Sequence, residues 1–267
     1  MTSLETLQVR LRALRLTTAA QVAGQLVSQA QTDNWSLETF ACELLAQEYD
    51  GRRQRRIERL VTEAHLPADK TLATFDVKRL PLRIQRLLPN LCAGDFVDRA
   101  ENLFIFGLPG RGKTHFAAAV GYELVHRERH VLFTPTYRLV GQLLRAKRDL
   151  ELERELRRLD RFAVLILDDL GYVQQSREEM EVLFTLLAER YERRSVVITS
   201  NLVFSQWDQI FKDPMTTAAA IDRVVHHSLI IEFGKEITSR RAEDAQRAQR
   251  PPATPEPATT PSAGAAA

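Results

Sequence analysis

The chain has 267 residues, 44% of them hydrophobic, and its 37 lysines and arginines against 35 aspartates and glutamates leave a formal net charge of +2. Such a chain can bury one substantial core and form a smaller second domain. No apolar run approaches the roughly 20 residues that cross a bilayer, and the N-terminus lacks an apolar secretory core. We therefore expect a cytoplasmic protein with no membrane contact. Because the net charge is near zero, binding to nucleic acid would have to come from a local basic patch.

The N-terminal residues 1–75 predict a small helical domain. Four leucines at helical spacing indicate a first helix, and a second is expected to begin near Thr17. A third amphipathic pattern follows Ser36, a suitable N-cap, but Thr39 stands where a reciprocal capping box needs Glu or Gln.

The third helix carries the most basic stretch of the chain. Its arginines recur at positions i, i+3, i+4 and i+7, which places them on one face of a helix; they are Arg52, Arg55, Arg56 and Arg59. Apolar residues repeat the same spacing on roughly the opposite face. The helix could therefore dock by its apolar side and offer arginines to phosphates of DNA. A solvated charged face is an equally open interpretation, and no interleaved aromatic residue adds base stacking to the first.

Residues 66–82 contain two prolines and are expected to connect the helical domain to the next one. In residues 76–245, strand and helix patterns alternate. This alternation predicts an α/β fold with a mostly parallel sheet and helices on both faces, whose ligands lie at the carboxyl ends of the strands. Strands are expected at 103–106, 131–134, 163–167, 195–199 and 229–231.

The first of these strands leads into a glycine-rich turn and then a helix-like segment, with the spacing G-x-x-x-x-G-K-[ST] of a P-loop. Glycines let the backbone turn tightly and aim its N–H groups at an anion, and the following helix N-terminus attracts phosphate. Lys113 would contact the β- and γ-phosphates, and the Thr114 hydroxyl would bind Mg²⁺. The nucleotide-binding candidates are Gly107, Leu108, Pro109, Gly110, Arg111, Gly112, Lys113 and Thr114.

Two further strands also end in polar residues. The run 163–167 is followed by Asp168 and Asp169, and the run 195–199 by Ser200 and Asn201. Asp168 closes a Walker B pattern and would hold Mg²⁺ directly or through water. Asp169 stands where a nucleoside triphosphatase needs a carboxylate to orient and deprotonate water. The Asn201 amide could bind the γ-phosphate or that water.

The chain resembles the IstB-like ATPases, which assist insertion-sequence transposases, and more distantly the DnaC-like helicase loaders; both belong to the AAA+ class. The resemblance covers roughly residues 1–245. It rests on the P-loop, on 165–171 and 199–202, on the stretch that contains Trp207, and on Ala220 to Ser228 around Arg223.

The resemblance implies further roles. Asn201 matches the sensor 1 position, and Arg223 matches the arginine finger that reaches the nucleotide of a neighbouring subunit, which implies a homo-oligomer. Arg240 is the best match for sensor 2, although the residues around it depart from the family pattern. Asp169 also departs from the Glu that many AAA+ members carry, so water positioning and turnover are expected to differ.

Together these features predict an AAA+ ATPase that uses ATP and Mg²⁺, oligomerises, binds double-stranded DNA without sequence preference and regulates the transposase of the same element. A DnaC-like loader of a replicative helicase is the alternative. A nucleotide-gated binding module with negligible turnover is a third possibility. Residues 246–267, rich in Pro, Ala and Thr, are expected to be disordered.

Cysteine and histidine usage points to no metal centre. The two cysteines, Cys42 and Cys92, have no CxxC partner and predict free thiols. Four histidines also lack metal-ligand partners of matching type and are expected to be structural or on the surface: His126, His130, His226 and His227.

Overall fold

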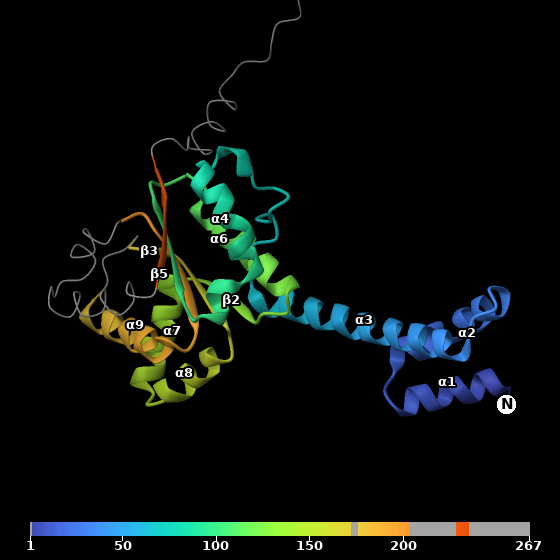
Figure 1. Cartoon of the computed structure of the whole chain (residues 1–267). Coiled ribbons are helices and arrows are strands. Elements are labelled where there is room, and N and C mark those ends of the chain that lie inside the picture. Colours follow the sequence, from blue (N-terminus) through green and yellow to red (C-terminus); the bar gives the residue numbers. More distant parts are fainter. Residues whose placement is uncertain (1, 172–175, 203–227, 235–267) are drawn as a thin grey trace, which may run out of the picture.

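The computed structural model describes residues 2–171, 176–202 and 228–234. It has two parts, an N-terminal helical unit and an α/β core, joined by one long helix (Figure 1). In the described part, no helix is both long and apolar enough to pass through a membrane.

The N-terminal unit consists of α1 (Ser3–Ala13), α2 (Thr17–Thr32) and the first half of α3 (Leu37–Ala64). The predicted N-cap is confirmed, because the Ser36 side chain accepts the backbone N–H of Thr39. The unit has a core of its own, which is small and built largely from leucine and alanine: Leu11, Ala19, Ala20, Ala23, Leu26 and Leu44.

Helix α3 belongs to both parts. Its 28 residues correspond to a length of about 42 Å at 1.5 Å per residue. Leu44 lies in the N-terminal core, whereas Leu60 and Ala64 lie in the core of the α/β part. The predicted docking of this helix by its apolar side is therefore confirmed.

The α/β core is a five-stranded, all-parallel sheet in the order β2-β3-β4-β1-β5. Two connections pass over other strands to reach this order. The connection from β1 to β2 passes β4 and β3, and the connection from β4 to β5 passes β1. The strands are β1 (Asn102–Gly107), β2 (Val131–Pro135), β3 (Val164–Leu170), β4 (Ser195–Ser200) and β5 (Ser228–Phe233).

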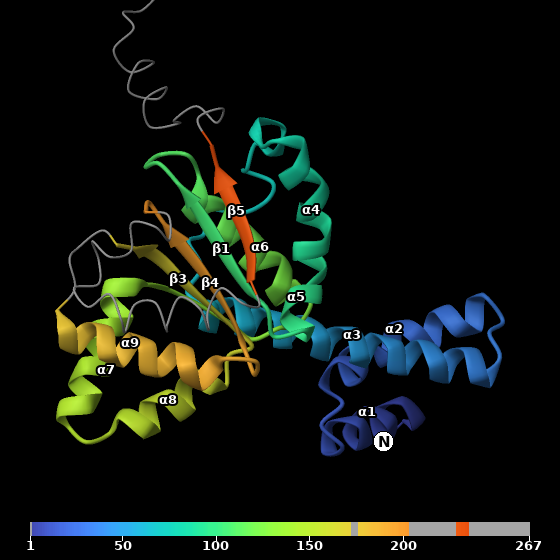
Figure 2. The ribbon, with the colours of Figure 1, turned by 60° about the vertical axis from the view of Figure 1, so that its left-hand side comes forward.

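Helices cover both faces of the sheet, as Figure 2 shows. On one face lie α4 and α6, and on the other α7, α8 and α9. The helices and short turns of the core are η1 (Val77–Arg79), α4 (Leu82–Ala93), α5 (Asp95–Asp98), α6 (Lys113–His126), α7 (Thr136–Arg148), α8 (Leu152–Asp160) and α9 (Arg177–Arg190).

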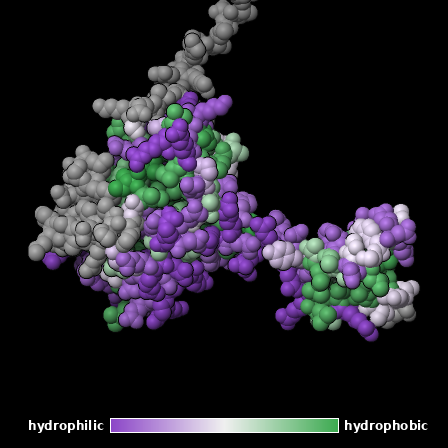
Figure 3. Space-filling model, in the orientation of Figure 1, coloured by the Kyte–Doolittle hydropathy of each residue, from purple (hydrophilic) through white to green (hydrophobic). Residues whose placement is uncertain are grey.

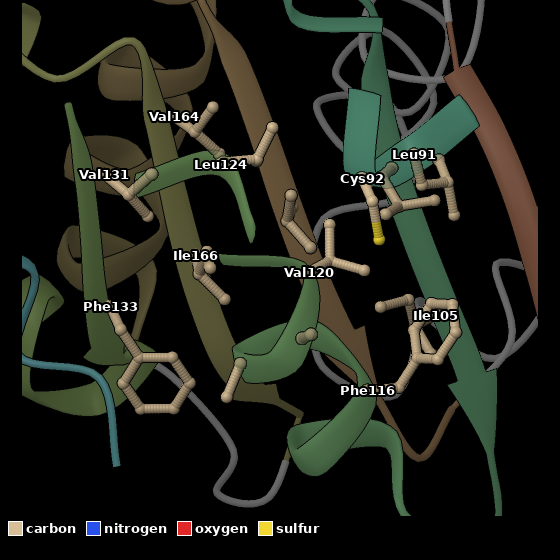
Figure 4. Packing of buried hydrophobic residues seen from close by; sticks show 14 of the residues in the cluster. Leu91, Cys92, Ile105, Phe116, Val120, Leu124, Val131, Phe133, Val164 and Ile166 are labelled. Atoms are coloured by element: carbon tan, nitrogen blue, oxygen red, sulfur yellow. The ribbon is translucent and has the colours of Figure 1, made fainter. Parts of the chain in front are cut away.

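Alternation along β1 separates two apolar clusters. Leu103 and Ile105 pack into the cluster beneath α4 and α6, whereas Phe104 and Phe106 pack into the cluster beneath α7 to α9. Figure 4 shows the first cluster, with side chains of α6 filling the space between the strands and α4. Each fully buried side chain of this size contributes about 1.5–3 kcal/mol, so the position of α6 on the sheet is strongly determined.

The fold class predicted from the sequence is confirmed in each respect. Strands and helices alternate, the sheet is parallel and both of its faces are covered. The cysteines are free thiols, Cys42 exposed and Cys92 buried, and burial raises the pKa of Cys92 to about 11. Within the described residues, no group of three or more histidine, cysteine or acidic side chains is arranged to hold a metal ion.

Candidate functional site

The P-loop connects the end of β1 to the start of α6, as its motif predicts. Gly107, Gly110 and Gly112 all have positive φ angles, of 148°, 79° and 91°, a region that residues with a Cβ rarely adopt. Gly107 has a second constraint, because a Cβ there would lie 2.6 Å from the carbonyl oxygen of Phe233. The loop therefore needs glycine both for its turn and for the close approach of β5.

The adjacent residue Arg111 ties the loop to the end of β5. Its guanidinium donates a hydrogen bond to the backbone carbonyl of Gly234. Together with the close contact at Gly107, this bond fixes the loop against the strand that pairs with β1. The loop is thus supported from the sheet side by two independent contacts.

Lys113 begins α6, and its side chain is 7% exposed. Its Nζ donates to the carbonyl oxygen of Leu108 at 3.1 Å and to Oδ1 of Asn201 at 2.5 Å. Because an ammonium only donates, the oxygen of the Asn201 amide faces Lys113 and its nitrogen faces the other way. That nitrogen donates to Oδ1 of Asp169 at 3.2 Å.

Thr199 completes the connection on the acidic side. Its hydroxyl donates to Oδ1 of Asp168 at 2.6 Å and accepts the backbone N–H of Asp169 at 2.9 Å. A continuous hydrogen-bonded chain therefore runs from Lys113 through Asn201, Asp169 and Thr199 to Asp168. The three polar strand ends predicted from the sequence lie together at one edge of the sheet.

An irregularity in β3 shapes the acidic pair. The register between β3 and β4 shifts between Leu167 and Leu170, and Asp169 has a φ of 63°, which aspartate tolerates better than most residues. Such bulges re-aim side chains near functional sites. Asp169 is consequently exposed at the surface, while the Asp168 backbone carbonyl accepts a hydrogen bond from the Thr136 hydroxyl.

Sequence reasoning did not single out Thr199 and Thr136. Both are threonines at the carboxyl end of an otherwise apolar strand or just after it, and both are buried. A polar residue in such a position was the available signal. Its partners could not be read from the sequence, because they depend on which strands are neighbours.

The basic face of α3 precedes this site in the sequence, and its four arginines form ion pairs. Arg52 and Arg55 both approach Glu48, at 2.7 and 3.6 Å. Arg56 pairs with Glu128 of the core at 3.3 Å, and Arg59 reaches Glu63 only at 4.0 Å. All four side chains are still about half exposed or more, so the structure leaves both interpretations of this face open.

Glu48 is the buried centre of these contacts. It accepts the backbone N–H groups of Thr18 and Ala19 at 2.8 and 3.0 Å and thereby caps α2, which has no side-chain cap of its own. Burial raises the pKa of Glu48, but the hydrogen bonds from Ala19, Arg52 and Thr18 outweigh it, and the pKa lies below its ordinary value. Part of the basic face therefore has a structural role.

A groove of about 960 Å³ lies elsewhere, between α4 and the edge strand β5. The surface over β5 beside α4 is apolar, as the space-filling view shows (Figure 3). Its lining includes Ile230, Leu87 and Arg86 and none of the residues from Gly107 to Thr114. This groove is therefore separate from the P-loop, and the candidate site is identified by its hydrogen bonds rather than by a cavity.

Several predicted residues lie outside the described residues. These are Trp207, Arg223, His226, His227 and Arg240, together with the terminal segment 246–267. Their predicted roles stay predictions.

The model of the family described as IstB-like ATP binding protein matches residues 9–248. The chain belongs to this family. Among its relatives, a putative insertion sequence ATP-binding protein of Sinorhizobium fredii is 42% identical over 249 residues, 92% of this chain and 84% of the relative. The insertion sequence IS21 putative ATP-binding protein of Pseudomonas aeruginosa is 38% identical over 242 residues, 91% of each chain.

Solved structures agree on the fold of this IstB-like protein. The DnaC helicase loader matches with a TM-score of 0.52 at 18% identity, over 62% of this chain and 98% of that one. AMPPCP-bound DnaA from Aquifex aeolicus matches with a TM-score of 0.52 at 17% identity, over 71% of this chain and 58% of that one. The fold is that of an AAA+ P-loop ATPase core, and both the family and the fold inferred by resemblance are confirmed.

Proposed function

We propose that this IstB-like protein binds ATP with Mg²⁺ between the P-loop and the Asp168–Asp169 pair, hydrolyses it, and acts in the cytoplasm as a DNA-associated helper of an insertion-sequence transposase. The observation that carries the proposal is the hydrogen-bonded chain from Lys113 to Asp168. It places a cation, an amide and two carboxylates around one edge of the sheet, which is the donor set that a metal-bound triphosphate requires.

The residues present fit a magnesium ion. Within the part of the chain that the structure describes, neither the Thr114 hydroxyl nor the second carboxylate oxygen of Asp168 has a hydrogen-bond partner. Hydroxyl and carboxylate oxygens are the ligands that this hard cation prefers. When bound, the ion neutralises charge on the β- and γ-phosphates, and Thr114 and Asp168 are the residues that would hold it.

Phosphate binding would replace contacts that now occupy Lys113. Its bonds to Leu108 and Asn201 use oxygen acceptors, and phosphate oxygens are stronger acceptors for an ammonium. As Lys113 turns to the phosphates, the Asn201 amide is left to orient the water that attacks the γ-phosphate. Asp169 would accept the proton of that water, since its carboxylate already lies within hydrogen-bond distance of Asn201.

The transposition role is supported by the relatives rather than by the site. The named relatives at 42% and 38% identity are insertion sequence ATP-binding proteins. The likeness to the DnaC helicase loader is at 18% identity and concerns the fold. Regulation of the transposase encoded by the same element is therefore favoured over loading of a replicative helicase.

For DNA we propose a sequence-independent contact through the basic face of α3. Arg59 is its most available member, with a side chain 68% exposed and a 4.0 Å approach to Glu63. Arg56 would exchange Glu128 for phosphate, and Arg52 and Arg55 would add charge while remaining near Glu48. Such a surface gives similar affinity for all duplex sequences and a steep dependence on salt.

Hydrolysis is tested by phosphate release with and without duplex DNA. We expect Lys113→Ala and Asp169→Ala each to abolish release, because one removes phosphate binding and the other the base. A native rate that neither substitution changes would refute the enzyme and leave a nucleotide-gated binding module. Glu58→Ala, an exposed acid on α3, is the control that should retain the native rate.

Assembly is tested by sizing the chain with ATP, with and without DNA. Arg223 would reach the γ-phosphate of the neighbouring subunit, where a guanidinium neutralises charge that develops in phosphoryl transfer. We expect the native chain to form a larger species with ATP and Arg223→Ala to remain small. An identical size distribution for both chains would refute the arginine finger, and Arg240→Ala tests the predicted sensor 2 in the same assay.

A further inference from the structure

The segment that follows α3 lies along the P-loop helix. Residues 66–75, here called the connector, begin with Leu66 against Gly121, where an added Cβ would lie 2.9 Å from the leucine. They end with Phe75, whose ring lies 3.4 Å from the Cβ position of Gly112. The connector therefore follows α6 from its second half back to the glycine that precedes Lys113.

His115 joins the connector to the first turn of α6. Its Nε2 lies 3.1 Å from the carbonyl oxygen of Thr71 and 3.1 Å from Oγ1 of Thr74. A carbonyl oxygen only accepts, so Nε2 carries the proton and donates to both. His115 follows Thr114 directly, and these bonds therefore bring the connector within one residue of the proposed magnesium ligand.

The turn that receives these bonds is internally braced. The Thr74 hydroxyl donates to the carbonyl of Asp69 at 2.7 Å, and the same oxygen accepts the backbone N–H of Thr71 at 3.1 Å. The neighbouring Phe75 ring packs edge-on against the His115 ring, with centroids 5.0 Å apart. A shift of His115 would consequently move the turn as a unit.

The opposite end of α6 contacts α3 as well. Glu128, in the turn after α6, forms ion pairs with Arg53 at 3.1 Å and Arg56 at 3.3 Å. The exposed fraction of the Glu128 side chain is 27%, so these pairs are partly protected from solvent. Helix α3 and the connector are thus attached to α6 near both of its ends.

We propose that His115 is a positioning residue that couples nucleotide at the P-loop to the connector, and through it to the direction of α3 and the N-terminal unit. The inference rests on the proposed nucleotide site. Phosphate binding moves Lys113 and Thr114 in the first turn of α6. His115 belongs to the same turn, and its bonds to Thr71 and Thr74 transmit the change to the connector.

The test is hydrogen exchange of the full chain with and without Mg²⁺ and AMPPCP. In the native chain we expect nucleotide to slow exchange in the P-loop and, by at least about fivefold, in residues 69–76; this factor is the low end of typical coupling between sites. In His115→Ala the P-loop should still be protected and the connector should not respond. His115→Gln, whose amide nitrogen can reach the position of Nε2 and donate to the same oxygens, should restore part of the response.

Two further variants separate coupling from general damage. Thr74→Val breaks the turn without altering α6 and should abolish the connector response in the same way. His126→Ala removes an exposed histidine of α6 whose ring bonds the carbonyl of Tyr122 within the same helix, and it should behave like the native chain.

The outcomes are distinguishable. A connector that responds equally in His115→Ala, or that does not respond in the native chain although the P-loop is protected, would overturn the coupling alone. A native P-loop that gains no protection would overturn the nucleotide site and the coupling with it.

Discussion

Replacing Glu48 by alanine tests how the N-terminal unit is attached to α3. The carboxylate accepts two backbone N–H groups at the start of α2, at 2.8 Å from Thr18 and 3.0 Å from Ala19. It also pairs with Arg52 at 2.7 Å. The substitution removes these three contacts and the 3.6 Å approach of Arg55, and it leaves the P-loop and its neighbours unchanged.

The cost follows from these contacts. Loss of a helix cap destabilises by about 1–2 kcal/mol, and an ion pair with a half-exposed arginine adds less than about 1 kcal/mol. We therefore expect the N-terminal unit to lose about 1–3 kcal/mol of stability. Hydrogen exchange of α1 and α2 amides should accelerate about 5- to 150-fold, since each 1.4 kcal/mol corresponds to a factor of ten.

The control is Glu58→Ala, which removes an equal charge from an exposed position on the same helix whose side chain accepts from Gln54. It should change exchange in α1 and α2 by less than about twofold, as surface substitutions usually do. Equal exchange rates for the Glu48→Ala and native chains would refute the capping role. Nucleotide binding should be the same in all three chains.

Glu48 also predicts a pH dependence. Its pKa is lowered by folding, so its stabilising effect is complete above the unfolded value of about 4.3 and is lost as the pH falls through the lower folded value. Exchange in α2, corrected for intrinsic rates, should therefore accelerate below that range in the native chain. A Glu48→Gln chain with the same acid dependence would contradict this assignment.

Three further substitutions, and one control at Gly141, test other contacts. Gly107→Ala places a Cβ 2.6 Å from the Phe233 carbonyl oxygen. Calorimetry should therefore show weaker ATP binding and a free energy of unfolding that is lower by about 2 kcal/mol or more. The control Gly141→Ala, where an added Cβ meets open space, should instead raise the free energy of unfolding by about 0.5–1 kcal/mol. Arg190 is buried and donates to four backbone carbonyls; it is still charged at neutral pH although burial lowers its pKa to about 9. Arg190→Met should lower the free energy of unfolding in urea by about 3 kcal/mol, and a loss below about 1 kcal/mol would refute a stabilising role for these bonds. Arg59→Ala should weaken binding to duplexes of any sequence and reduce the slope of log affinity against log salt by about 1, and an unchanged slope would remove it from the DNA contact.

Contiguous motifs carried most of what could be predicted about this fold. The P-loop spans eight consecutive residues, and its glycines, lysine and threonine define their own geometry. The apolar runs before Asp168 and Asn201 identify strands buried on both faces, and a parallel sheet brings their carboxyl ends to one edge. The class of fold and the neighbourhood of the site therefore follow from local patterns.

The bonds within the site depend on strand order, which local patterns do not determine. Thr199 meets Asp168 because β3 and β4 are neighbours, and Asn201 meets Lys113 because β1 lies on the other side of β4. The shift in register near Leu170 turns Asp169 outward, and no residue type in the sequence predicts such a bulge.

The basic face shows the same limit in a different way. Arg52 lies four residues after Glu48 and Arg55 seven residues after it, so a pairing along α3 was readable from the spacing. The link from Glu48 to the start of α2 was not, because it joins residues about thirty positions apart. The pairing of Arg52 and Arg55 with Glu48 is thus local, whereas the capping role of Glu48 depends on the packing of α2 on α3.

The central claim is that a metal-bound triphosphate lies between the P-loop and Asp168. Calorimetric titration of ATP into the native chain, with and without Mg²⁺, tests it most directly beside Lys113→Ala and Asp168→Asn. We predict that the native chain binds ATP more tightly with Mg²⁺ than without it. Lys113→Ala should lose about 2 kcal/mol or more of ATP-binding free energy, and in Asp168→Asn the affinity for ATP should not depend on Mg²⁺. Equal ATP affinity in all three chains, whether or not Mg²⁺ is present, would contradict the account.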